Sequence, residues 1–185
     1  MKELALHILD ILHNSITAGA TLVEVTVVED TMEDVLEFSI TDNGKGMSPE
    51  FVQKVIDPFT TSRTTRKVGL GIPLLKQAAE ECGGGLSVES EVGVGTTVTA
   101  RFVHSHIDRQ PLGDMAETMH GVMTSFENVD FVYTHTVDGN TFSMDTREIK
   151  KILGGVPLNA PEVLLWLLEY LRDGENSVQI GGCSI

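Results

Sequence analysis

The stretch LHILDILHNSITAG, residues 6–19, carries the pattern on which the fold assignment depends. Its apolar residues recur with helical spacing, so we predict a helix over residues 3–17. His7, Asp10 and Asn14 interrupt that apolar surface at positions i, i+3 and i+7, which places them on one helix face. Polar groups on a largely buried helix need partners, because unpaired burial is costly. This face either meets water or binds a polar ligand.

Three glycine clusters follow this helix, each between predicted regular elements. They are DNGKGM at residues 42–47, GLG at residues 69–71 and GVGTT at residues 93–97. Glycines let a backbone approach a ligand closely, and successive N–H groups can cradle phosphate oxygens. The second cluster opens a helix predicted over residues 71–82, so the positive end of that helix would face an anion. Any single cluster could be an ordinary turn, and DNGKGM is the more specific signal because an acidic residue leads it.

One window of the sequence is basic although the chain as a whole is acidic. The chain has 13 Lys and Arg against 27 Asp and Glu, a net charge of −14, yet no acidic residue occurs from Pro58 to Ala79. That window contains Arg63, Arg66, Lys67 and Lys76. We interpret the hydroxyl-rich, aperiodic loop at residues 57–67, which overlaps the start of this window, as a lid that contacts phosphate, the alternative being an exposed loop.

Composition excludes several classes of protein. With 41% hydrophobic and 22% charged residues, the 185-residue chain has globular composition. Its acidity argues against binding nucleic acid or an anionic membrane surface, since both require a basic face. No apolar run reaches the roughly 18 residues that span a bilayer. The two cysteines, Cys82 and Cys183, suit a reducing compartment. We therefore expect a soluble, cytoplasmic protein that binds neither nucleic acid nor membrane.

The remaining pattern predicts an α+β fold with a boundary near residue 104. Before the boundary we expect strands at 21–29, 35–41, 86–90 and 96–103 and a helix at 49–56 capped by Ser48. After it we expect helices at 112–124, 145–153 and 161–172, a hairpin at 130–145 that turns at Asp138-Gly139, and a poorly anchored end of ten or so residues. Met115, Met119 and Met123 form one helix face, which is either core or an interaction groove.

Taken together, these motifs resemble the N, G1, F, G2 and G3 boxes of the GHKL ATPase superfamily, which includes gyrase B, MutL and the ATP-binding domains of sensor histidine kinases. The matching segments, in order and spacing, are Asp10–Asn14, Asp42–Met47, Asp57–Ser62, Gly69–Leu74 and Gly93–Thr97. The resemblance implies a Bergerat-type α/β sandwich, in which helices cover a mixed, mainly antiparallel sheet, with ATP and Mg²⁺ as ligands. It divides the chain into an ATP-binding domain at 1–103 and a small α+β extension at 104–185.

The resemblance also implies roles for individual residues. Asn14 would bind Mg²⁺, Asp42 would accept a hydrogen bond from the adenine amino group, and Asp10 would act as general base. The ATP-hydrolysing members and the anti-sigma-factor serine kinases carry a glutamate at the position of Asp10, so this base is one methylene shorter. Further nucleotide contacts are expected from the glycine clusters and the lid: Gly44, Gly46, Met47, Thr60, Thr61, Arg63, Lys67, Gly69, Leu70, Gly71 and Thr96.

Three functions fit this set of residues. The first is a regulator that phosphorylates a partner protein, as the anti-sigma-factor serine kinases do. The second is a slow ATPase in which lid closure drives formation of a homodimer, and the third is a module that senses ATP without chemistry. In addition, residues 106–112 match four positions of a histidine-kinase phosphoacceptor box, but their order is wrong for the family and they follow a strand, which favours a connector before the next helix.

Overall fold

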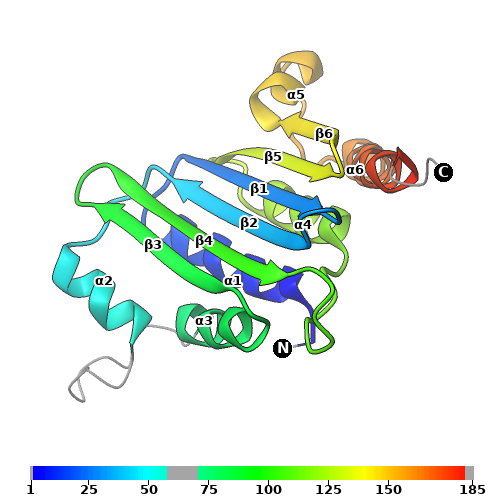
Figure 1. Cartoon of the computed structure of the whole chain (residues 1–185). Coiled ribbons are helices and arrows are strands. Elements are labelled where there is room, and N and C mark those ends of the chain that lie inside the picture. The colour runs from blue at the N-terminus through cyan, green and yellow to red at the C-terminus, as the bar shows by residue number, and fades with distance from the viewer. Residues whose placement is uncertain (1, 58–70, 182–185) are drawn as a thin grey trace.

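Six strands form one mixed sheet in the order β3-β4-β2-β1-β5-β6. The structure, a computed structural model, describes residues 2–57 and 71–181. The strands are β1 (Leu22–Asp30), β2 (Val35–Asp42), β3 (Gly85–Glu91), β4 (Gly95–Val103), β5 (Asp130–Val137) and β6 (Asn140–Asp145). The described helices are α1 (Leu4–Thr17), α2 (Pro49–Ile56), α3 (Gly71–Glu81), α4 (Met115–Ser125), α5 (Thr146–Leu153) and α6 (Pro161–Gly181). Neighbouring strands are antiparallel except β1 and β5, which are parallel, so the fold is the mixed, mainly antiparallel α+β sandwich predicted (Figure 1).

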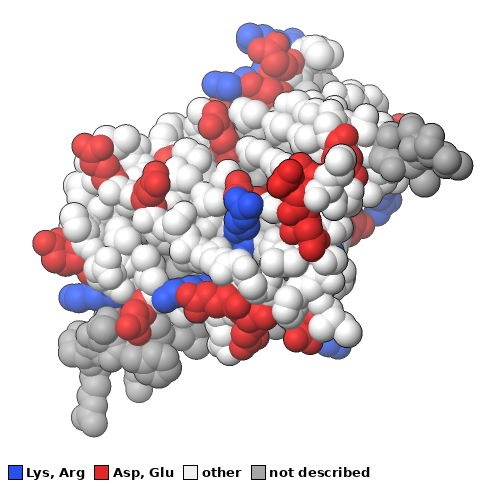
Figure 2. All heavy atoms as spheres, in the orientation of Figure 1, with Lys and Arg blue, Asp and Glu red and all other residues white. Residues whose placement is uncertain are grey.

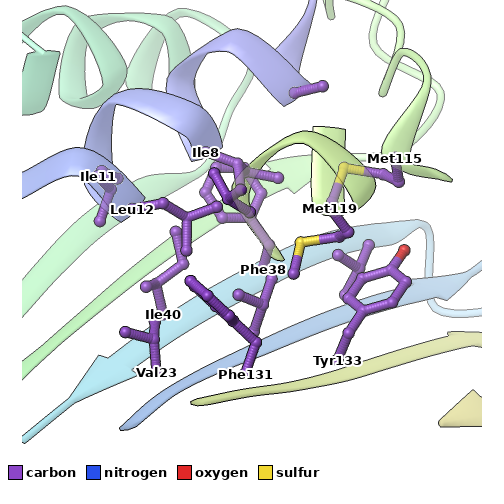
Figure 3. Close-up of a cluster of buried hydrophobic side chains, with 14 of the residues drawn as sticks. Ile8, Ile11, Leu12, Val23, Phe38, Ile40, Met115, Met119, Phe131 and Tyr133 are labelled. Atoms are coloured by element: carbon purple, nitrogen blue, oxygen red, sulfur yellow. The ribbon is translucent and has the colours of Figure 1, made fainter. Parts of the chain in front are cut away.

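The core lies between the sheet and helices on one of its faces. Strand alternation turns the apolar residues of β1 and β2 toward these helices, and Val23, Val27 and Phe38 are fully buried. Side chains of α1 and α4 point at them, as Figure 3 shows for Ile8, Leu12, Met115 and Met119. The methionine face of α4 is therefore core, because Met115, Met119 and Met123 are at most 1% exposed.

The opposite face of the sheet is polar and turns away from α1 and α4 (Figure 1). One row across all six strands carries a hydroxyl side chain on every strand: Ser87, Thr99, Ser39, Thr26, Thr134 and Ser143. Figure 2 shows acidic side chains spread over this side of the molecule, with few basic ones among them. An antiparallel sheet with one packed and one hydrated face accounts for this alternation.

Residues after the predicted boundary extend the same sheet. β5 pairs with residues 22–29 of β1 although about a hundred residues separate the two strands, and β6 follows through a turn at Asp138 and Gly139, both with positive φ. The division into 1–103 and 104–185 stays a prediction, and the sheet crosses it. Helix α4 begins at Met115 instead of residue 112, because Asp114 caps it by accepting from the Glu117 amide at 2.9 Å. Residues 106–112 form no helix.

The expectation of a poorly anchored C-terminus is wrong for residues 175–181, which continue α6. Glu175 holds this part of the helix in place. Its Oε1 accepts from the Tyr133 hydroxyl at 2.6 Å, and its Oε2 lies 2.8 Å from His135 Nδ1. A Cβ on Gly174 would collide with the ring of Phe142, so glycine is what allows α6 to lie against β6.

A buried polar cluster joins the end of β1 to β5 and α6. His135 is fully buried, and its Nε2 lies 3.0 Å from Glu29 Oε1. Glu29 Oε2 in turn lies 2.9 Å from His104 Nε2. Burial alone would lower the pKa of His135, but the carboxylates of Glu175 and Glu29 outweigh burial and raise it to about 9. Burial likewise opposes ionisation of Glu29, yet the two histidines lower its pKa. A histidinium thus sits between two carboxylates where three elements meet.

Candidate nucleotide-binding site

A pocket opens between the second half of α1, the loop after β2, helix α2 and the start of β4. Its walls are largely apolar and include Ile11, Met47, Phe51, Ile72 and Val98. The described part encloses about 180 Å³, which is less than the roughly 300–1,000 Å³ of pockets that hold a whole ligand. The apolar walls and this size suit one ring system of a larger molecule.

Asp42 is the acidic group of this pocket, and both of its carboxylate oxygens are held. The Ser15 hydroxyl donates to Oδ2 at 2.6 Å, and the Gly44 amide donates to Oδ1 at 2.9 Å. Ser15 is buried at 3% exposure, which fixes the direction of its hydroxyl group. Thr96 is the residue opposite Asp42 in the β2–β4 register and also lines the pocket. A carboxylate fixed in this way presents its remaining lone pairs in a constant direction.

Two of the predicted glycine clusters pack on each other. The Gly93 amide donates to the Lys45 carbonyl at 2.7 Å, and the Met47 amide donates to Ser90 Oγ at 2.8 Å. Gly46 has φ +69° and lies directly against the Glu91 carbonyl. The loop at 42–47 is therefore held in place by the turn between β3 and β4, and glycine is required where the two backbones touch.

Replacing Gly46 by Ala should destabilise the protein by about 2 kcal/mol more than replacing Gly93 by Ala. Both residues have positive φ, so both substitutions cost about 1 kcal/mol in backbone strain. Only at Gly46 would the new Cβ also collide with backbone, since Gly93 has open space around it. Chemical denaturation of the two variants measures the difference. Equal losses would show that the loop does not pack on the turn as described.

The polar stripe of α1 runs from a buried to an exposed position. Neither ring nitrogen of His7 has a hydrogen-bond partner among the described residues, and burial lowers its pKa. One turn further, Asp10 lies beside the first residue of α3: a Cβ placed on Gly71 would be 3.4 Å from Asp10 Cβ and 3.5 Å from Oδ2. Asn14 is exposed and lines the pocket. The stripe therefore brings a carboxylate and an amide to the pocket and the start of α3.

Several predicted contacts fall outside the described residues, and the residues not predicted include three polar ones in or next to the pocket. Thr60, Thr61, Arg63, Lys67, Gly69 and Leu70 belong to the first group. Ser15, Lys45 and Ser90 belong to the second. Lys45 stands between two predicted glycines, and Ser15 follows Asn14 directly, so their neighbours in sequence were a signal. Ser90 had no comparable signal, because its partners come from other loops.

The sequence matches a known family and two curated relatives. The family model described as "Histidine kinase-, DNA gyrase B-, and HSP90-like ATPase" matches residues 2–106. Histidine protein kinase DivJ of Caulobacter vibrioides is 35% identical over 83 residues, which are 43% of this chain and 14% of the relative. Sensor protein SrrB of Staphylococcus aureus is 41% identical over 80 residues, 40% of this chain and 13% of the relative. The chain thus matches about one seventh of the length of these relatives.

Two solved structures are similar at low sequence identity. One is the Aquifex aeolicus MutL ATPase domain complexed with ADP, with a TM-score of 0.48 and 18% identity, covering 83% of this chain and 70% of that one. The other is the N-terminal domain of a DNA repair protein, with a TM-score of 0.49 and 15% identity, covering 96% of this chain and 57% of that one.

Within the described residues, no helix combines the length and apolar character needed to cross a bilayer. Since the family model covers more than half of the sequence, this chain belongs to the histidine kinase-, DNA gyrase B- and HSP90-like ATPase family.

Proposed function

We propose that the chain binds Mg-ATP in this pocket and transfers the γ-phosphate to a partner protein, as a regulatory kinase. The observation that carries the proposal is the convergence of three groups at one place. Asp10, Asn14 and the first residue of α3, Gly71, lie together beside the pocket that contains Asp42. Phosphoryl transfer needs mainly positioning and neutralisation of charge, which a carboxylate, a metal-binding amide and a helix N-terminus supply together. Membership in an ATPase family supports the nucleotide.

The end of the pocket around Asp42 suits the adenine base. Asp42 would accept a hydrogen bond from the exocyclic amino group, and Thr96 lies beside it on the neighbouring strand. The backbone of Gly44 and Gly46 and the side chain of Met47 would lie along the ring. A Cβ on Gly44 would come within 3.0 Å of Ala18 Cβ and of Asp42 Oδ1, so a larger residue there would push into the site. The apolar walls would cover the faces of the base.

The end of the pocket at Asn14, near the start of α3, suits the phosphates and a metal ion. Mg²⁺ is usually held by one or two protein oxygens together with phosphate and water oxygens. The exposed amide of Asn14 fits that role, and the described residues contain no cluster of His, Cys, Asp and Glu able to hold a metal without phosphate. Bound Mg²⁺ would neutralise phosphate charge. The amide of Gly71 at the start of α3 would face the phosphates, together with Gly69 and Leu70 of the same glycine cluster and the lid residues Thr60, Thr61, Arg63 and Lys67.

Asp10 would act as the base that takes the proton of the attacking hydroxyl group. Its place one helical turn before Asn14 also favours a second candidate, a slow ATPase. In that enzyme water would attack the γ-phosphate, and closure of the lid over ATP would drive formation of a homodimer. A base must lie within hydrogen-bond reach of its proton, directly or through one water. Since aspartate is shorter than glutamate, a partner's hydroxyl that projects into the site is the easier group for Asp10 to reach.

Incubating purified protein with γ-labelled ATP, alone and with lysate of the source cell, separates these functions. We expect label to move to another protein, and Asp10→Asn to stop that transfer while ATP still binds. Free phosphate above background without transfer would favour the ATPase, and binding with neither outcome would favour an ATP sensor. His13→Ala is a suitable control, since His13 is exposed on the same helix and does not line the pocket.

Asn14→Ala should remove the dependence of ATP binding on Mg²⁺. With wild-type protein, ATP affinity should rise about tenfold when Mg²⁺ replaces EDTA, because the ion links the amide oxygen to the phosphates. In the variant the affinities with and without Mg²⁺ should coincide. Fluorescence titration of a labelled nucleotide measures both. A variant that retains the full Mg²⁺ effect would remove Asn14 from the metal site.

A further inference from the structure

Thr96, which lines the pocket opposite Asp42, is hydrogen-bonded to a residue outside the pocket, Ser90. Ser90 is the penultimate residue of β3 and is paired with Thr96 in the β3–β4 register. Its Oγ accepts from the Met47 amide at 2.8 Å, donates to the Gly95 carbonyl at 3.0 Å and lies 2.8 Å from Thr96 Oγ1. Ser90 itself does not line the pocket.

The three contacts of Ser90 Oγ can all be hydrogen bonds at once in only one arrangement of protons. A serine hydroxyl has one proton to donate, and that of Ser90 goes to the Gly95 carbonyl. Either hydroxyl could donate between Ser90 and Thr96, and in this arrangement Thr96 is the donor, so Thr96 Oγ1 has only lone pairs left for the pocket. The Ser15 hydroxyl likewise gives its proton to Asp42 Oδ2. At the end of the pocket around Asp42, the side chains of Ser15 and Thr96 thus present acceptors, as the carboxylate itself does.

We propose that Ser90 is a positioning residue that keeps this end of the pocket free of hydroxyl donors and thereby selects a purine with an amino group over one with an oxo group. The proposal rests on nucleotide binding and adds how the base is chosen. An exocyclic amine brings protons to these acceptors. An oxo group at the same position brings lone pairs, which face the Asp42 carboxylate and Thr96 Oγ1 without a proton between them.

Removing the Ser90 hydroxyl frees the proton of Thr96. The Thr96 hydroxyl can then rotate and donate into the pocket, where it meets an oxo group favourably. Ser90→Ala should therefore improve binding of the oxo purine relative to the amino purine. A loss of loop stability alone would weaken both ligands by the same factor, so the ratio of the two affinities separates positioning from support.

ATP and ITP differ in this group and form the test pair. Wild-type protein should prefer ATP by more than about tenfold, since a hydrogen bond to a charged group is gained and an unpaired acceptor is avoided. Ser90→Ala should lower that preference by about tenfold, Ser90→Thr should keep it, and Ser87→Ala on the hydrated face of β3 should change neither affinity. A preference in Ser90→Ala equal to wild type overturns the proposal.

A second variant tests whether Ser90 acts through Thr96. Thr96→Val keeps the shape of the side chain and should lower the ATP preference on its own, and adding Ser90→Ala should lower it no further. If Ser90→Ala does not fold, an unchanged preference in Thr96→Val overturns the proposal. Failure of the wild-type protein to bind either nucleotide would contradict the proposed function, whereas ATP binding with unchanged preferences in the variants would contradict only the role of Ser90.

Discussion

Replacing Asp42 by Asn is expected to weaken ATP binding about 100-fold. The carboxylate accepts from the Ser15 hydroxyl and the Gly44 amide, one donor on each oxygen. An asparagine would have to place its NH₂ group against one of these two donors, so the side chain would turn and the acceptor for the base would be lost. A hydrogen bond to a charged group contributes about 1.5–3 kcal/mol, and 2.7 kcal/mol corresponds to 100-fold in affinity.

Titration calorimetry with ATP measures this effect, and Glu24→Gln is its control. Glu24 lies on the hydrated face of β1 and does not line the pocket, so its substitution removes the same charge away from the site. The control variant should bind ATP as the wild-type protein does. If Asp42→Asn binds ATP within twofold of wild type, the assignment of the adenine site is wrong.

Replacing His135 by Ala should lower the free energy of unfolding by about 3–5 kcal/mol. The substitution leaves Glu29 and Glu175 close together without the positive charge that both contact, and breaking a buried ion pair by removing one partner costs about this much. Thr134→Ala, on the neighbouring position of β5 that faces the hydrated side, should change stability far less. Denaturation in guanidinium chloride compares the two. A loss below about 1 kcal/mol for His135→Ala would contradict the described cluster.

The same cluster predicts how stability depends on pH. The pKa of His135 rises on folding from 6.5 to about 9, so the folded state binds the proton more tightly than the unfolded state. The contribution of protonated His135 to the free energy of unfolding is complete below pH 6.5 and is lost as pH rises through about 9. The wild-type protein should therefore lose stability between these two values. His135→Gln should have a flatter profile over that interval.

The sequence predicts the local elements well because their signals lie within a few residues. The spacing of Ile8, Ile11 and Leu12 predicts α1, and Asp138-Gly139 predicts the hairpin turn. The parallel pairing of β5 with β1 has no such signal, since it joins segments about a hundred residues apart. The same limit explains the end of α6: only the contacts of Glu175 with Tyr133 and His135 show that this segment is anchored.

The residues of the candidate site also divide into those with a local sequence signal and those placed by long-range contacts. Asp10, Asn14 and Asp42 belong to motifs with recognisable spacing, so the sequence alone proposes them. Ser90 escapes sequence reasoning because its partners are a backbone amide at residue 47, a carbonyl at residue 95 and a side chain on the neighbouring strand. The motif glycines were expected to approach a ligand, whereas the described contact of Gly46 is with the turn after β3. Spacing proposes candidate residues, and only the packing shows what each one touches.

The most direct test of the account is an NMR titration of the isotopically labelled protein with ADP. The central claim is that an adenine nucleotide binds between α1, β2 and β4. It predicts that the amide resonances of Ser15, Gly44 and Thr96 move together and saturate at one equivalent of ADP, while those of β6 and α5 stay in place. Shifts concentrated on β6 and α5, or resonances around Asp42 that do not move at saturating ADP, would contradict it.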